Sequence, residues 1–330
     1  GDVYKRQRWG RRAAPHLKAV RGAAIALQQA HLPFGIITRR QLSELGRYRV
    51  VILPNVSRMD AGEVEAFRKY VGDGGCVYAS HYTSLIETRG VRHPDFLLAD
   101  VFGCDLESEE GAPRSVYLKP STPLAALMAP QQYVSFSPLE DALAGGLLRL
   151  RPCEGSVLAT LTLPYAHAKP GRANDRNWAS IHSSPPWEET DAPVIVGNRY
   201  GQGRCVYSAA TLETIEHPAA RRLFVGLVRD LLGGPARFEA EAHPAIWINA
   251  FDQPDADRVQ INFLNPLAQS GPLPGFRVSF ELRPPAGRSF HALTGVPENT
   301  PVPFEIDAAG TLRATVDDLI DFKMLVAETR

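Results

Sequence analysis

Apolar residues in the first two thirds of the chain follow the period of a helix in some stretches and form continuous runs in others. Helical spacing over residues 16–31 predicts a helix that Pro33 ends, and a short apolar strand is expected at residues 34–37. The run VVILPN, Val50–Asn55, is rich in β-branched residues, as is typical of a strand buried on both faces of a parallel sheet.

A second helix and strand follow in the same order. Asp60, with Glu63 three residues later, predicts a capping box at the start of a helix, which Gly74 and Gly75 end. The stretch CVYAS, Cys76–Ser80, is the next buried strand, and a further short helix is expected at residues 95–102. Helices that alternate with buried strands predict an α/β fold with a flavodoxin-like, doubly wound parallel sheet. A strand expected before the first helix is not visible.

The remaining pattern predicts a second domain. Strands are expected near residues 115–118 and 156–163, and residues 193–210 read as two strands joined by a glycine turn. Pro218 begins another helix. After Pro235 the apolar residues alternate with polar ones, and turn residues separate these runs. We therefore expect an α/β domain over residues 8–235 and a small all-β sandwich domain over residues 236–330.

The composition of the chain argues against several classes of function. The formal net charge is zero, so no overall field attracts nucleic acid or an anionic membrane. No apolar run approaches the roughly 20 residues that a membrane helix needs. The four cysteines form no CxxC pair, so neither a zinc site nor a disulfide framework is expected. We expect no cofactor, no metal, no nucleic acid and no membrane as partners.

We interpret the first seven residues as not encoded by the gene of this protein. Asp2 to Gln7 are what the end of a sequencing-library transposon adapter encodes, so we interpret Gly1–Gln7 as adapter read-through. The missing first strand agrees with this interpretation, and we expect the gene to continue upstream. The compartment stays open for the same reason, with the cytoplasm as the preferred location.

The stretch TSLIETRGVRHPDFLLADVFG resembles a segment of class I glutamine-amidotransferase-like domains in uncharacterised glycoside hydrolases, which read T-S-L-Y-D-E-x-G-x-x-R-x-D-F-x-L-A-D-L-F-G. The chain departs from this pattern at Ile86-Glu87-Thr88. VVILPN, EVEAFRKYVGDGG and NRYGQGRCVYSAA also look like the β-galactosidase trimerisation domain of family-42 glycoside hydrolases. The directly matching residues are Thr83, Ser84, Leu85, Gly90, Asp95, Phe96, Leu98, Ala99, Asp100, Phe102 and Gly103.

In that family the trimerisation domain follows a catalytic (β/α)₈ barrel and precedes a small β-domain. The resemblance implies that this chain is a C-terminal fragment of a glycoside hydrolase whose barrel is missing. It also implies a homo-oligomer, a trimer by resemblance, with carbohydrate as a further partner. The parent protein would hydrolyse glycosides, whereas this fragment would be catalytically silent.

The residues themselves favour a silent domain. A true amidotransferase needs a nucleophilic cysteine on a tight turn after the strand that ends at Ser80. Cys76 lies at the opposite end of that strand. Tyr78 and Tyr82 are too large to flank a nucleophile elbow at Ser80, because such turns take small neighbours. We therefore expect no catalytic residue in the chain.

A ligand or interface pocket is the alternative role for the polar residues at the strand ends. Asn55, Ser80, His81 and Tyr82 should meet there, since carboxyl ends of strands in open α/β sheets form a crevice. Trp187, beside a proline turn, is a candidate for stacking on a sugar.

Two other classes of function stay open. One is a carbohydrate-binding module that uses Trp178, Trp187 or Tyr82 as a sugar platform. The other is a small amidohydrolase in which Ser80 pairs with His182 or His217. A carboxylate pair for glycoside cleavage is also conceivable, but nothing in the sequence places two of these residues across a sugar. The carboxylates considered are Glu188, Glu189, Asp191, Glu213 and Glu216.

Overall fold

The computed structural model describes residues 15–109, 116–127, 133–135, 147–165, 185–267 and 275–330. Contacts divide the chain into two units. The first comprises residues 1–23 and 37–233, and the second comprises residues 24–36 and 234–330. Each unit has its own sheets and is described below by itself.

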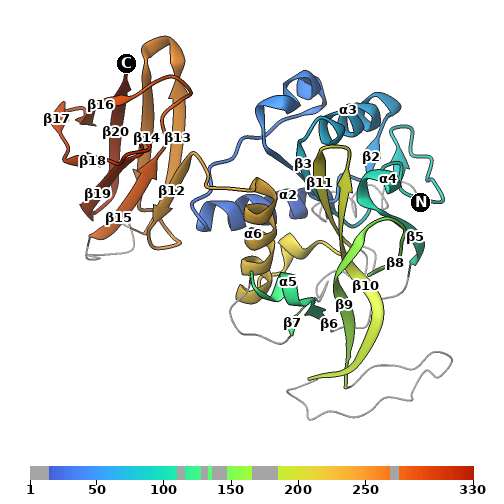
Figure 1. Cartoon of the computed structure of the whole chain (residues 1–330). Coiled ribbons are helices and arrows are strands. Elements are labelled where there is room, and N and C mark those ends of the chain that lie inside the picture. The colour runs from blue at the N-terminus through green and yellow to red at the C-terminus, as the bar shows by residue number, and fades with distance from the viewer. Residues whose placement is uncertain (1–14, 110–115, 128–132, 136–146, 166–184, 268–274) are drawn as a thin grey trace, which may run out of the picture. The chain divides into compact units, whose positions relative to one another are not determined.

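A large, curled, mixed sheet of seven strands forms the centre of the first unit (Figure 1). Its first three strands run parallel, and the remaining neighbours are antiparallel. The expectation of a parallel sheet is therefore correct only for three strands. In spatial order the strands are β1 (Val50–Leu53), β3 (Cys76–Ser80), β11 (Gly203–Ser208), β10 (Pro186–Tyr200), β9 (Ser156–Pro164), β6 (Tyr117–Pro120) and β7 (Val134–Ser135).

The change of direction inside this sheet arises at the turn between β10 and β11. Only Gly201 and Gln202 join the two strands, which is too short for the crossover that a parallel pair needs. Gly201 has a left-handed φ of +57°, and a Cβ there would approach the Gly72 Cα to 2.7 Å. The expected glycine turn is confirmed, and it is also the reason that β10 runs antiparallel to β11.

The helices α3 (Ala61–Gly72) and α6 (Pro218–Leu232) begin where the sequence signals at Asp60 and Pro218 predict. Asp60 Oδ1 accepts a hydrogen bond from Glu63 N at 2.9 Å, and Glu63 Oε2 accepts one from Asp60 N at 2.8 Å, so the capping box is confirmed. The helix expected at residues 95–102 is shorter than predicted. The helical elements are α2 (Pro15–Gln29), whose residues from Ala24 onward belong to the second unit, the 3₁₀ helix η1 (Arg39–Arg47), α3 (Ala61–Gly72), α4 (Ala99–Phe102), α5 (Thr122–Ala125), the 3₁₀ turn η2 (Leu212–Thr214) and α6 (Pro218–Leu232).

Two small sheets complete the first unit. β2 (Arg58–Met59) pairs in parallel with β4 (Ile86–Glu87), and β5 (Cys104–Glu109) pairs antiparallel with β8 (Leu148–Pro152). The strand expected at residues 34–37 is absent from the structure, and that prediction is wrong.

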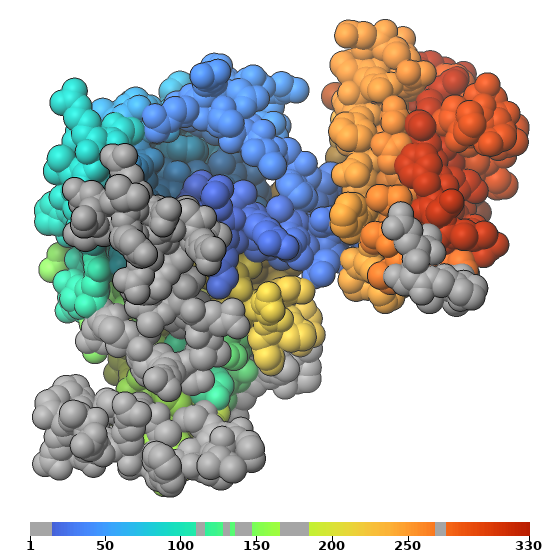
Figure 2. Space-filling model, turned by 180° about the vertical axis from the view of Figure 1, so that it is seen from behind, coloured from blue at the N-terminus to red at the C-terminus, as the bar shows by residue number. Residues whose placement is uncertain are grey.

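The second unit contains two antiparallel sheets and the 3₁₀ turn η3 (Pro254–Ala256). One sheet has the order β12 (Phe238–Glu241), β15 (Phe276–Leu282), β19 (Leu312–Leu319) and β18 (Phe304–Ile306). The other has the order β13 (Trp247–Gln253), β14 (Arg258–Leu264), β20 (Phe322–Thr329), β16 (Phe290–Val296) and β17 (Thr300–Pro301). These strands appear in orange to red in Figures 1 and 2.

One hydrophobic core joins the two sheets of the second unit. Val259 and Ile261 of β14 belong to the same buried cluster as Val278 of β15. Phe263 of β14 and Phe280 of β15 bring their ring centroids to 5.5 Å across the core. The alternation expected for both strands is confirmed, because every second residue of each is buried.

Candidate functional site

Polar residues gather where the three parallel strands of the first unit end. Asn55 follows β1, Ser80 ends β3, and Ser208 of β11 lies opposite Ser80. Asn55 N donates to Ser80 Oγ at 3.0 Å, and Asn55 Oδ1 accepts from Tyr82 N at 3.2 Å. The structure therefore brings Asn55, Ser80 and Tyr82 together at one edge of the sheet.

Glu213 lies beneath this edge, on the 3₁₀ turn η2. Its side chain is only 3% exposed. Ser80 Oγ donates to Glu213 Oε1 at 2.6 Å, and Tyr78 OH donates to Glu213 Oε2 at 2.9 Å. A Cβ on Gly22 of α2 would lie 2.4 Å from the Glu213 carbonyl oxygen, so only glycine lets that helix pass so close.

Burial controls the ionisation of the Glu213 carboxyl group. Removal from water raises the pKa of Glu213 to about 7, although the hydrogen bonds from Ser80 and Tyr78 act in the opposite direction. Burial also raises the pKa of Tyr78 well above its ordinary value, with the nearby Glu213 charge adding to the effect. Tyr78 is therefore a donor to the carboxylate and does not ionise at neutral pH.

The tight turn after β3 occurs at His81 and not at Ser80. His81 is 2% exposed and has a φ of 50°, a left-handed conformation that side chains with a Cβ rarely adopt. Its backbone N donates to Ser208 O at 2.8 Å, and its carbonyl oxygen accepts from Tyr207 OH. These two bonds hold the strained residue against β11.

Tyr82 is covered by charged and aromatic neighbours. Its ring centroid lies 4.0 Å from that of His81, and the Arg92 guanidinium lies 5.4 Å from the ring centroid. Tyr82 OH donates to Glu109 Oε2 at 3.0 Å, and Arg92 also forms an ion pair with Glu109. These contacts occupy the ring that was a candidate sugar platform.

Trp187 lies far from the other candidate residues. It is 64% exposed and packs edge-on against Tyr165, with ring centroids 5.0 Å apart. Ile195 of β10 pairs with Ser208, which in turn pairs with Ser80. The strand from Trp187 to Ile195 covers roughly 25 Å, so the structure does not join Trp187 to the cluster at Ser80.

The Ser80 hydroxyl is fully buried and pairs with a carboxylate instead of an imidazole. A serine nucleophile needs a base, usually an imidazole, that takes its proton. Within the described residues, Ser80 Oγ bonds to the Glu213 carboxylate and to Asn55 N. His217 caps α6, where its Nδ1 accepts from Ala219 N at 3.2 Å. His182 and Trp178 lie outside the described residues.

Glu189 and Cys76, which were also considered for chemistry, lie away from Ser80 or have other partners. Glu189 Oε2 accepts from Lys119 Nζ at 2.5 Å, and this bond together with one from Tyr133 lowers the pKa of Glu189. Cys76 begins β3, at the far end from Ser80. Within the described ranges, no group of three or more His, Cys, Asp or Glu residues is arranged to hold a metal ion.

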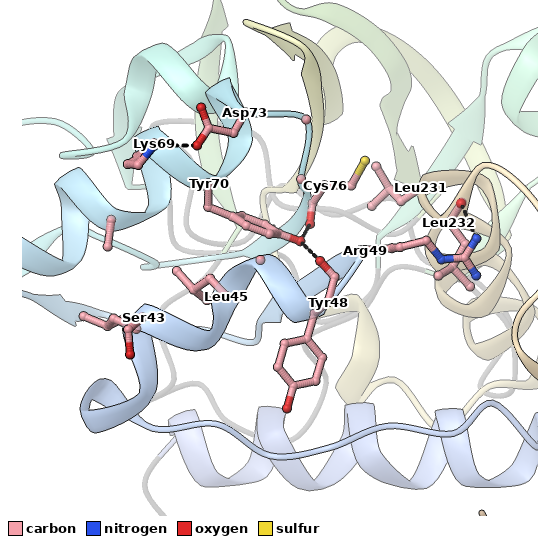
Figure 3. Close-up of a pocket in the computed structure, with 15 residues that line it drawn as sticks. Ser43, Leu45, Tyr48, Arg49, Lys69, Tyr70, Asp73, Cys76, Leu231 and Leu232 are labelled. Carbon is pink, nitrogen blue, oxygen red and sulfur yellow. Dashed lines mark hydrogen bonds and ion pairs between the residues drawn. The ribbon is translucent and has the colours of Figure 1, made fainter. Parts of the chain in front are cut away.

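A hollow of about 630 Å³ opens at the other end of β3 (Figure 3). Tyr70 OH reaches across it and donates to Tyr48 O at 2.9 Å. Lys69 Nζ pairs with Asp73 at 2.6 Å, and Arg49 donates to Leu232 O at 3.4 Å. These polar groups are bonded to one another and are spread along the wall, so they do not converge on a ligand position.

Among the helices that the structure describes, none has the length and apolar character needed to cross a membrane.

Comparison by sequence finds no matching protein family and no matching curated protein. Solved structures do match. α-L-Fucosidase isoenzyme 2 from Paenibacillus thiaminolyticus has a TM-score of 0.69 and 19% identity, over 95% of this chain and 45% of that one. A β-galactosidase from Bacillus circulans sp. alkalophilus has a TM-score of 0.60 and 15% identity, over 94% of this chain and 37% of that one.

A catalytic mutant of a GH42 β-galactosidase from G. stearothermophilus matches with a TM-score of 0.62 and 11% identity, over 95% of this chain and 36% of that one. The chain thus spans less than half the length of these solved proteins. Its fold is shared with part of the structure of each of these glycoside hydrolases.

Proposed function

We propose that this chain is the non-catalytic accessory region of a glycoside hydrolase and holds copies of that enzyme together as a homo-oligomer. In this proposal the first unit is an amidotransferase-like domain of flavodoxin-like type, similar to the β-galactosidase trimerisation domain. The second unit is a small β-sandwich. In the proposal, a separate catalytic barrel carries the hydrolysis of glycosides.

The coverage of the structural matches is the observation that carries the proposal. The fold extends over 94% to 95% of this chain but over only 36% to 45% of the fucosidase and β-galactosidases. Both units, the mixed sheet and the antiparallel sheets, therefore fall within the matched part of these enzymes. In the proposal, this matched part lies outside the catalytic domain of each enzyme.

The chemistry at the strand ends supports a silent domain. Ser80 donates its proton into a hydrogen bond with the buried Glu213, and its oxygen accepts from a backbone amide. The residue on the tight turn is His81, which is buried and held by backbone bonds. A polar cluster used in this way stabilises the edge of the sheet and leaves no exposed nucleophile.

The oligomer is tested by measuring the mass of the purified chain in solution. Light scattering coupled to size exclusion should give three times the chain mass of 36.2 kDa at micromolar concentration. A mass equal to one chain at all concentrations would refute the assembly role.

The small amidohydrolase is the competing function that the same site would have to perform. A serine-directed fluorophosphonate probe should leave the chain unlabelled under the proposal. Labelling that disappears in Ser80→Ala would instead assign a hydrolase to this domain.

A further inference from the structure

The outer face of the five-stranded sheet in the second unit carries exposed aromatic side chains. Trp247 and Phe251 of β13 are 45% and 52% exposed, and Phe322 of β20 is 50% exposed. The intervening residue Ile248 packs against the core cluster. Because successive side chains of a strand point to opposite faces, Trp247 and Phe251 point away from that core.

Trp247 and Phe322 form a row across neighbouring strands with a third outward residue, Leu264, which is 36% exposed. Trp247 of β13 pairs with Leu264 of β14, and Leu264 pairs with Phe322 of β20 (Figure 1). Adjacent strands lie about 4.8 Å apart, so Trp247 and Phe322 are separated by about 10 Å across the sheet. An exposed apolar strip of this kind, bordered by polar groups, marks a binding surface.

A ladder of amide side chains borders the strip. Arg258 Nε donates to Gln253 Oε1 at 2.6 Å, and Gln253 Nε2 donates to Gln260 Oε1 at 3.2 Å. Gln260 Nε2 then donates to Asn262 Oδ1 at 3.1 Å. Because each side chain in this series donates to the next, the amide hydrogens of Asn262 have no acceptor within the series. Asn262 lies in the row next to the apolar strip.

Asn249 lies opposite Asn262 in that same row. Its side chain makes no hydrogen bond to any other residue that the structure describes. The side-chain amides of Asn249 and Asn262 therefore both have N–H donors available beside the row that contains Trp247. Groups of this type orient a ligand whose apolar part rests on the strip.

The charge of this surface restricts the class of ligand that it can bind. The apolar row and the amide row are formed by neutral side chains, and charge enters only further along the strands, where Arg258 of β14 pairs with Glu328 of β20 and donates to Gln253. An anionic ligand would find no available cation in these two rows. A pyranose sugar fits them, because its C–H face packs on an aromatic ring while its hydroxyls reach neighbouring amides.

We propose that this sheet face binds a neutral oligosaccharide chain, with Trp247 and Phe322 stacking on its rings and Asn249 and Asn262 bonding its hydroxyls. The face is open and flat, so several sugars of one chain contribute and a single sugar binds weakly. This site adds a ligand to the accessory role proposed above and is independent of the oligomeric state.

The test uses the full chain in native gels containing galactan, xyloglucan or galactomannan, with polygalacturonate as the acidic comparison. At least one neutral polysaccharide should retard the protein, and polygalacturonate should not. Trp247→Ala and Phe322→Ala should each weaken retardation about tenfold, the order expected for losing one stacked aromatic. Asn262→Ala should weaken it while leaving the apolar strip intact.

Phe34→Ala is the control, since it removes an aromatic ring that is 46% exposed and lies outside the strands of this sheet, and it should leave retardation unchanged. The proposal is overturned if no neutral polysaccharide retards the chain, or if Phe34→Ala and Trp247→Ala lose retardation equally. It is also overturned if Trp247→Ala changes only the oligomeric mass, because the strip is then a protein interface. An unchanged mass with lost retardation supports the sugar site, whatever the mass of the wild-type chain.

Discussion

Ser80 and Glu213 lie 133 residues apart in the chain and share a hydrogen bond of 2.6 Å in the interior of the first unit. The bond ties the end of β3 to the turn that follows β11. It also directs the serine hydroxyl toward a buried carboxylate, where a substrate cannot reach it. The geometry of the cluster therefore supports a structural role for Ser80.

Replacing Ser80 with alanine tests that role. Ser80→Ala removes the acceptor for Asn55 N and a donor to Glu213, both buried, so the free energy of unfolding should fall by about 1–3 kcal/mol. Urea denaturation measures the change. Ser43→Ala, at an exposed serine of η1, is the control and should shift stability by less than about 0.5 kcal/mol. Equal stability of the two variants would exclude a structural role for the bond.

The pKa of Glu213 makes the stability of the chain depend on pH. In the folded protein it is about 7, raised from 4.5 by burial. The folded state thus holds a proton that the unfolded state has lost between these two pH values. The stabilisation that the buried, protonated Glu213 provides is fully present below pH 4.5. It is lost as the pH rises through 7, and the total loss in the free energy of unfolding is about 3 kcal/mol.

Glu213→Gln removes this titration while keeping the size of the side chain. The free energy of unfolding of the variant, relative to wild type, should rise by about 3 kcal/mol between pH 4.5 and pH 8. Urea titrations at a series of pH values give this difference directly. A difference that stays constant over the whole range would show that Glu213 titrates normally in the folded chain.

Gly22 offers a test of the packing behind the cluster. A methyl group there would lie 2.4 Å from the Glu213 carbonyl oxygen, which is backbone and cannot rotate away. Gly22→Ala should therefore lower the unfolding free energy by about 1–3 kcal/mol despite the better helix propensity of alanine. Gly46→Ala is the control, because nothing lies within 4 Å of its added carbon. Thermal unfolding of the two variants compares them.

Local signals in the sequence predicted most elements of the first unit. The capping box at Asp60, the buried run at Val50 and the glycine turn at Gly201 each act over a few residues, and each is present in the structure. The expected strand at residues 34–37 failed because an apolar run also needs a partner strand. Ile36 is 73% exposed. The strands near residues 115–118 and 156–163 were expected, but their antiparallel pairing within the main sheet was not, since pairing is decided between distant segments.

The candidate site was foreseen only in part. Asn55, Ser80 and Tyr82 meet because carboxyl ends of parallel strands share an edge, which the strand pattern reveals. Glu213 belongs to a three-residue turn without periodicity, so no pattern links it to Ser80. The left-handed turn at His81 could not be predicted, because the sequence has no glycine or asparagine at that position. Trp187 proved to be distant because β10 extends well beyond the parallel strands.

The most direct test of the central claim is an assay for glycoside hydrolysis by the purified chain. Nitrophenyl α-L-fucoside, nitrophenyl β-D-galactoside and a wider nitrophenyl glycoside panel are incubated with micromolar protein, and released nitrophenol is followed over a day. The account predicts release at the rate of a buffer control. Release that rises in proportion to the protein, and that disappears in Ser80→Ala or Glu213→Gln, would contradict it.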